Sequence, residues 1–149
     1  MVDVPQRQKW MAIFAKASLQ SLEACISTLE LPSFEFLRSP EIGLTMVRGR
    51  MGGTGQPFNL GEMPLTRCVI QMCPPEGTVV GFGYVVGRSH RHAELAAIGD
   101  ALMQQPEWCE IMQSQVIDPL LADAQQRQIR QAKQVAATQV DFYTMRRGE

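Results

Sequence analysis

Arginine and glycine share one stretch of this chain, and together they could bind an anion. Residues 48–55 read RGRMGGTG, and such glycines let backbone N–H groups approach a phosphate or carboxylate beside the guanidinium groups. The stretch lacks the G-x-x-x-x-G-K-S/T spacing of a Walker loop and does not lead into a helix. Because glycine clusters also form wide turns, direct phosphate contact and a plain turn both stay open. The candidate contacts to an anion or a partner are Arg48, Arg50, Gly52, Gly53, Gly55, Arg67, Arg88, His92 and Glu94.

A metal site is a second kind of chemistry to test, at the sequence HRHAE of residues 90–94. On an extended strand, His90 and His92 would lie on one side and could hold a metal with Glu94. On a helix, residues two apart point about 200° apart, so the rings would diverge and serve as capping or interface groups. Helix-forming residues follow, and we therefore predict no metal site in this chain.

Cysteine spacing and nucleophile motifs add no further chemistry. No pair of cysteines has C-x-x-C spacing, and no serine lies in a G-x-S-x-G motif. The sequence therefore predicts reduced, mostly buried thiols and no recognisable set of catalytic residues. The cysteines are Cys25, Cys68, Cys73 and Cys109.

The composition is that of one soluble domain. The chain has 149 residues, of which 45% are hydrophobic and 19% charged, with a net charge of -1. That charge divides into -1 for residues 1–37, +3 for 38–91 and -3 for 92–149, so nothing steers nucleic acid or an anionic membrane globally. The start is polar and no apolar run reaches about 20 residues, which predicts a cytoplasmic protein.

The candidate contacts lie on a predicted α+β domain of residues 1–149. Residues 5–31 form a helical hairpin whose second helix is capped by Ser18, residues 34–86 contain the sheet, and residues 90–149 hold further helices and the tail. Strands are expected at 34–37 and 41–51, then a loop at 52–64, then an antiparallel pair at 65–73 and 78–86. Gly81 and Gly83 in the last of these strands permit close approach by another backbone or a helix. In the second strand, Ile42, Leu44 and Met46 should face the core, and Arg48 and Arg50 continue that side to a rim. Alternatively, the strand twists or bulges at Gly49 and both arginines point to water.

The helices predicted after the sheet differ in how much apolar surface they bury. A helix at 90–105, capped by Ser89, is apolar on most sides and should be buried. A helix starts at Pro106, and the last one starts at Asp118 and Pro119 and carries many glutamines. Its apolar stripe is thin, so docking on a partner is expected for it. The tail residues Phe142, Tyr143 and Met145 either dock on a partner or fold back on the sheet.

Five separated blocks resemble one protein family. The blocks are Arg50–Gly55 (RMGGTG), Leu65–Arg67 (LTR) with Gly87 and Arg88, His92–Glu94 (HAE), Asp100–Gln105 (DALMQQ), and Val140–Phe142 (VDF) with Thr144 and Met145. In this order, and in a chain of this length from Arg7 onward, they resemble the G subunit of the carbon–phosphorus lyase system, the phosphonate metabolism protein PhnG family. The family pattern has one histidine in this region, which His92 matches and His90 does not.

The resemblance implies a subunit of a cytoplasmic core complex with the H, I and J subunits and an ATP-binding-cassette-like L protein. That complex transfers the ribose 5-triphosphate moiety of MgATP to an alkylphosphonate and releases adenine. The I subunit is implied to carry the displacement, and the J subunit to hold an iron–sulfur cluster and S-adenosylmethionine. No catalytic residue is assigned to the G subunit, so this chain is expected to be non-catalytic and to hold no cofactor itself.

A different class of function is left open by the residues themselves. The chain could act alone as a phosphate- or nucleotide-binding protein or as a metal-dependent enzyme. Its site would then combine the arginine–glycine loop with His90, His92 and Glu94. The two hypotheses differ in whether these groups converge in space.

Overall fold

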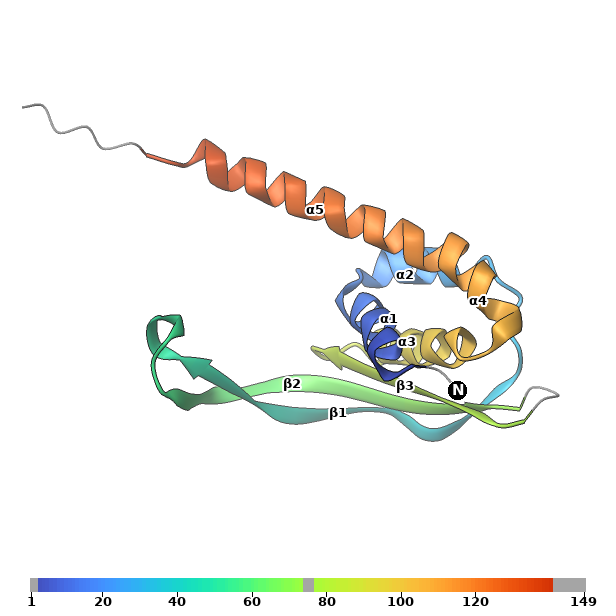
Figure 1. Cartoon of the computed structure of the whole chain (residues 1–149). Coiled ribbons are helices and arrows are strands. Elements are labelled where there is room, and N and C mark those ends of the chain that lie inside the picture. The colour runs from blue at the N-terminus through green and yellow to red at the C-terminus, as the bar shows by residue number, and fades with distance from the viewer. Residues whose placement is uncertain (1–2, 74–76, 141–149) are drawn as a thin grey trace, which may run out of the picture.

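A three-stranded antiparallel sheet and the helices on one of its faces make up the computed structural model, which describes residues 3–73 and 77–140 (Figure 1). The strands lie in the order β1-β2-β3. This arrangement confirms the predicted α+β class. In chain order the elements are α1 (Val4–Lys16), α2 (Leu19–Ile26), β1 (Phe34–Arg50), the 3-10 turn η1 (Met51–Gly53), β2 (Pro57–Met72), β3 (Val79–Val86), α3 (His90–Met103), α4 (Pro106–Met112), the π-helical turn η2 (Gln113–Ile117) and α5 (Asp118–Ala137).

The buried helix α3 packs closely on β3 because β3 presents glycines to it. A β-carbon on Gly81 would lie 2.8 Å from the β-carbon of Ala101, and one on Gly83 would lie 2.9 Å from the backbone nitrogen of Ala97. Neither position can hold a side chain without moving the helix. The structure thus confirms the expectation that these glycines permit close approach of a helix.

The first two helices complete the core. Trp10 and Phe14 of α1 and Leu22 and Ile26 of α2 are buried, in agreement with their helical spacing in the sequence. The predicted caps are also present, since the Ser18 hydroxyl accepts from the Ser21 N–H and the Ser89 hydroxyl from the His92 N–H.

The predicted loop at 52–64 is wrong for most of its length. Residues 57–64 belong to β2 and pair with β1, and only residues 51–56 make the connection. β1 is also one strand rather than two, because bulges near residues 36–41 let it continue through Pro40. Glycine and proline disfavour the interior of a strand, but they are tolerated at the start, edges and bulges of a two-stranded ribbon.

The last helix begins at Asp118 as predicted, but the break and the cap expected there are absent. α4 runs through η2 into α5 without a break, and Asp118 has right-handed helical backbone angles instead of those of a cap. Its carboxylate accepts a hydrogen bond of 2.6 Å from the Gln113 side chain. A proline at this position predicts the first turn of a separate helix, whereas the π turn accommodates it within a continuous helix.

Two elements extend away from the helix-covered body. The β1–β2 hairpin continues beyond β3, which pairs only with residues 65–72 of β2, and α5 projects from the helical layer toward the same side of the view as the hairpin (Figure 1). Leu44 and Met46 lie on this extension and are 65% and 48% exposed, and Ile42, which pairs with Thr66 just before the extension begins, is 45% exposed. The prediction that these three residues face the core is therefore wrong. The helices end before they reach this part of the sheet.

Candidate functional site

The arginine–glycine stretch forms the tip of the β1–β2 hairpin. Gly52 and Gly53 have φ values of 60° and 79°, which only glycine adopts readily, and they reverse the chain. The Arg50 guanidinium donates to the carbonyl of Gly55 at 3.3 Å, and the Gly55 N–H donates to the Met51 carbonyl at 2.9 Å. The glycines therefore build a turn that closes on itself.

Two arginines remain exposed around this tip. Arg48 and Arg50 line a shallow hollow of about 490 Å³ with Gly49, Gly53 and Pro57. No carboxylate of the described residues lies within ion-pairing distance of either guanidinium. The tip can thus present two cationic groups to an anion or to an acidic surface of a partner.

Arg67 lies away from the tip and is already engaged. Its guanidinium binds the carboxylate of Glu41 at 2.6 Å, and Arg38 binds the same carboxylate at 2.9 Å. The hydrogen bond from Arg67 is the main reason that the pKa of Glu41 lies below its usual range. These side chains are about half exposed, so both pairs contribute little to stability, and only the Arg67–Glu41 pair connects β2 to β1.

Arg88 lies at a third place, directly after β3. It is exposed and follows Gly87, whose carbonyl accepts from the Thr66 hydroxyl at 2.8 Å. The arginines of the middle segment therefore do not form one cationic surface. The structure brings Arg48 and Arg50 together and separates Arg67 and Arg88 from them.

His92 and Glu94 have structural partners of their own. His92 is buried, and its Nε2 donates to the carbonyl of Phe14 at 2.8 Å, which joins α3 to α1. Glu94 accepts from Arg91 at 2.8 Å, and Arg91 also binds Glu23 of α2 at 3.1 Å. His90 is exposed at the first turn of α3. These groups do not converge with the hairpin tip.

Metal-ligating groups do not gather anywhere in residues 3–73 and 77–140. No three histidine, cysteine, aspartate or glutamate side chains lie close enough there to hold a metal ion. The thiols are dispersed as well. Cys68 is buried, Cys25 and Cys109 are partly covered, and Cys73 is exposed, so the expectation of mostly buried thiols holds in full for Cys68 alone and is wrong for Cys73.

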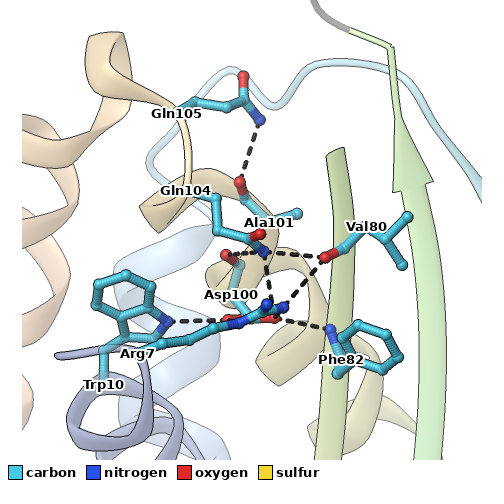
Figure 2. A network of polar contacts seen from close by, with 8 residues as sticks. All are labelled: Arg7, Trp10, Val80, Phe82, Asp100, Ala101, Gln104 and Gln105. Carbon is cyan, nitrogen blue, oxygen red and sulfur yellow. Dashed lines mark hydrogen bonds and ion pairs between the residues drawn. The ribbon is translucent and has the colours of Figure 1, made fainter. Parts of the chain in front are cut away.

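The most elaborate polar site is one that the residue-by-residue reasoning missed. Figure 2 shows the carboxylate of Asp100, on α3, surrounded by donors from α1, β3 and its own helix. Its Oδ1 accepts from the Trp10 indole at 2.9 Å and from Arg7 Nε at 3.1 Å. Its Oδ2 accepts from Arg7 Nη2 at 2.7 Å and from the Phe82 N–H at 2.9 Å.

This Asp100 network engages two backbone groups at the free edge of β3. The Arg7 and Gln104 side chains both donate to the carbonyl of Val80, at 3.3 and 2.9 Å. The Phe82 N–H donates to Asp100, so these two outward groups of the edge have partners. The Asp100 hydrogen bond is the main reason that the pKa of Arg7 is raised. An aspartate within an otherwise apolar helix was the signal that could have revealed it.

The remaining candidate residues are Phe142, Tyr143 and Met145, and they lie outside the described residues. No helix in the described part of the chain has the length and apolarity needed to cross a membrane.

The geometry defines a small α+β protein whose buried polar groups serve the fold, with two projecting elements. Residues 5–148 match the model of the family described as phosphonate metabolism protein PhnG, and the chain belongs to that family. It is 41% identical over 150 residues to the alpha-D-ribose 1-methylphosphonate 5-triphosphate synthase subunit PhnG of Rhizobium meliloti (strain 1021). That comparison covers 98% of this chain and 92% of the relative.

Proposed function

We propose that this chain is a non-catalytic subunit of an alpha-D-ribose 1-methylphosphonate 5-triphosphate synthase that serves organic phosphonate catabolism. The reaction transfers the ribose 5-triphosphate moiety of MgATP to an alkylphosphonate and releases adenine. The 41% identity over nearly the full length of a synthase subunit supports the assignment. A non-catalytic role is supported by His92 and Glu94, which are bound to Phe14 and Arg91 and are not free to act on a substrate.

The single observation that carries the proposal is the projection of α5 from the body. From Gln128 to Val140 every residue is exposed, although Ile129 and Val135 are apolar. An isolated helix of this length is marginal in water, so a surface that covers its apolar side would stabilise it. A partner subunit supplies such a surface.

The partners in this proposal are the H, I and J subunits of the core complex, together with the ATP-binding-cassette-like L protein. Nucleic acid and membrane are not partners. The chain holds no cofactor of its own, since MgATP is the substrate of the complex and the iron–sulfur cluster and S-adenosylmethionine belong to the J subunit. The complex works in the cytoplasm.

Recovery of the tagged chain from extract of its own cells tests this assembly. The H, I and J subunits should co-purify with it in stable proportion, and mass spectrometry identifies them. Recovery of the chain alone, at a concentration where all subunits are present in the extract, would contradict the proposal.

The exposed arginines at the hairpin tip suggest a second role within the same complex, which is contact with the triphosphate. Steady-state kinetics of Arg50→Ala in the intact complex separate the two uses of this residue. A raised Michaelis constant for MgATP with normal assembly indicates substrate contact, because charge-assisted bonds contribute about 1.5–3 kcal/mol each. A loss of assembly indicates contact with a partner subunit.

A further inference from the structure

The strands at the sheet edges differ in what prevents a further strand from pairing with them. On the β3 edge, the Asp100 network supplies partners for the Val80 carbonyl and the Phe82 N–H. Beyond β3, the outer edge of β2 is interrupted by Pro57, by Pro64 and by Leu60, which is an extra residue in the pairing with β1. Prolines and bulges prevent another strand from pairing at an edge.

The outer edge of β1 has one stretch without such protection. Up to residue 41 it is interrupted by Pro40 and two register shifts. From Glu41 to Val47 the pairing with β2 is continuous, and the stretch has neither a proline nor a bulge of its own. Where the hairpin extends past β3, beyond residue 43, no helix lies against it (Figure 1).

The register shows which backbone groups of this stretch point outward. The Phe82 N–H and the Val80 carbonyl point away from β2, so the backbone N–H and C=O groups of the intervening Gly81 bond to β2. Hydrogen bonding alternates along each strand, so Arg67 and Leu65 of β2 direct their groups toward β1. Their partners on β1 are Glu41 and Gly43.

Ile42, Leu44 and Met46 therefore direct their N–H and C=O groups away from the sheet. They are the same residues whose side chains are 45%, 65% and 48% exposed. An open row of backbone donors and acceptors and a row of exposed apolar side chains thus coincide. A two-stranded ribbon is marginal on its own in water, and a third strand would stabilise it.

We propose that a partner subunit adds an extended strand along residues 41–47 of β1. The strand carries apolar side chains at alternate positions, against Ile42, Leu44 and Met46, and a carboxylate near Arg48 or Arg50. Main-chain hydrogen bonds provide the affinity and the alternate side chains the specificity. This inference rests on the proposed function, because it locates one contact within the complex.

Charge favours a different chain over a second copy of this one. In a symmetric antiparallel pair centred on Leu44, Arg50 of one copy would stand opposite Arg38 of the other, and Arg48 opposite Pro40. Such a pair brings no carboxylate to the tip. The nearest acidic residue of the stretch, Glu41, is already bound by Arg38 and Arg67.

Residue-resolved hydrogen exchange, on the free chain and on the complex co-expressed with the other subunits, tests the strand addition. We expect the amides of Ile42, Leu44 and Met46 to exchange freely in the free chain and roughly tenfold or more slowly in the complex. The amides of Gly43, Thr45 and Val47 bond to β2 and should be protected in both, which makes them the internal control. Unchanged exchange at the three outward amides in the complex would overturn the inference.

A pair of variants tests the same contact through assembly. Leu44→Pro removes an outward N–H and leaves the pairing with β2, whereas Leu44→Thr keeps the N–H and removes the apolar side chain. Leu44→Pro should lower co-purification about tenfold, and Leu44→Thr by only about a factor of three. Equal losses, or normal assembly of Leu44→Pro, would refute backbone pairing.

The remaining outcomes are also decisive. If Leu44→Pro does not fold, the exchange experiment on the unaltered chain decides alone. Protection of the outward amides in a free chain that is dimeric would assign the edge to a second copy and overturn the proposal. If the unaltered chain binds no subunit at all, the proposed function fails, and that failure is distinct from a complex whose β1 edge stays open.

Discussion

At the scale of single residues, Asp100 is a buried carboxylate whose bonds connect three elements. The side chain is fully buried and accepts from Trp10, Arg7 and the Phe82 backbone. We expect Asp100→Ala to lower the free energy of unfolding by about 3 kcal/mol, because it leaves the guanidinium and the edge of β3 without their acceptor. Urea unfolding measures this loss.

The control for Asp100→Ala is a half-exposed ion pair. Arg91→Ala removes the contacts to Glu23 and Glu94 and should cost less than about 1 kcal/mol. Similar losses for the two variants would show that the Asp100 network contributes no more than a surface pair.

Cys68 should make stability fall at high pH. Burial is the main cause that raises the pKa of its thiol to about 11, whereas a thiol in the unfolded chain ionises near ~8.5. Between these values the unfolded state binds fewer protons, so stability decreases as pH rises, by up to about 1.4 kcal/mol per pH unit. Unfolding of the unaltered chain and of Cys68→Ala at about pH 8 and about pH 10.5 measures the effect. If the free energy of unfolding of Cys68→Ala decreases as much between these two pH values as that of the unaltered chain, Cys68 is not the group responsible.

At the scale of elements, the contact between β3 and α3 depends on an absent side chain. A methyl group at Gly83 would meet the α3 backbone, with the Ala97 nitrogen at 2.9 Å. Gly83→Ala should therefore destabilise the fold by roughly 1–3 kcal/mol, as overpacking does. Gly43→Ala is the matched strand control, since no atom lies within 4 Å of its added β-carbon. Thermal unfolding compares them, and equal midpoints would contradict the close packing.

The outer part of α5 should be dispensable for folding and required for assembly. Within residues 128–140, all side chains are exposed, so their removal costs the fold little. A chain that ends at residue 127 should unfold within about 0.5 kcal/mol of a chain that ends at residue 140, which is the usual range for surface changes. It should lose co-purification with the other subunits. A truncated chain that assembles at normal yield would exclude α5 as a docking element.

At the scale of the whole molecule, the net charge of -1 conceals a separation of charges. Arg38 and Arg67 share Glu41, and Arg91 is shared between Glu23 and Glu94, whereas the arginines of the hairpin tip remain exposed. The cationic excess of the middle segment is thus available mainly on the projecting hairpin. Such an arrangement suits contact with an acidic partner surface or a bound anion.

The isolated chain should bind MgATP weakly and carry no stoichiometric transition metal. His90, His92 and Glu94 do not converge with the hairpin tip, so no enclosed site combines them. Calorimetric titration with MgATP and elemental analysis of the purified chain test this expectation. Micromolar affinity for ATP, or one metal ion per chain, would favour the autonomous nucleotide binder or metal-dependent enzyme instead.

The sequence by itself determined the local elements and the family. Periodicity located α1 and α2, the caps Ser18 and Ser89 marked helix starts, and Gly81 and Gly83 predicted a close helix. The separated blocks indicated the family that the comparison then showed. These features are local because capping, turn chemistry and side-chain period act within a few residues.

Only the tertiary structure decided which groups meet. β2 extends through residues 57–64 because β1 provides its hydrogen-bonding partner. The composition of that stretch alone does not indicate this pairing. The same holds for Asp100, whose carboxylate oxygens face donors from residues 7, 10 and 82, and for Ile42, Leu44 and Met46, which alternate like core residues but are exposed. Burial and long-range strand pairing depend on where elements distant in the sequence end in space, and the local pattern of apolar and polar residues does not determine that position.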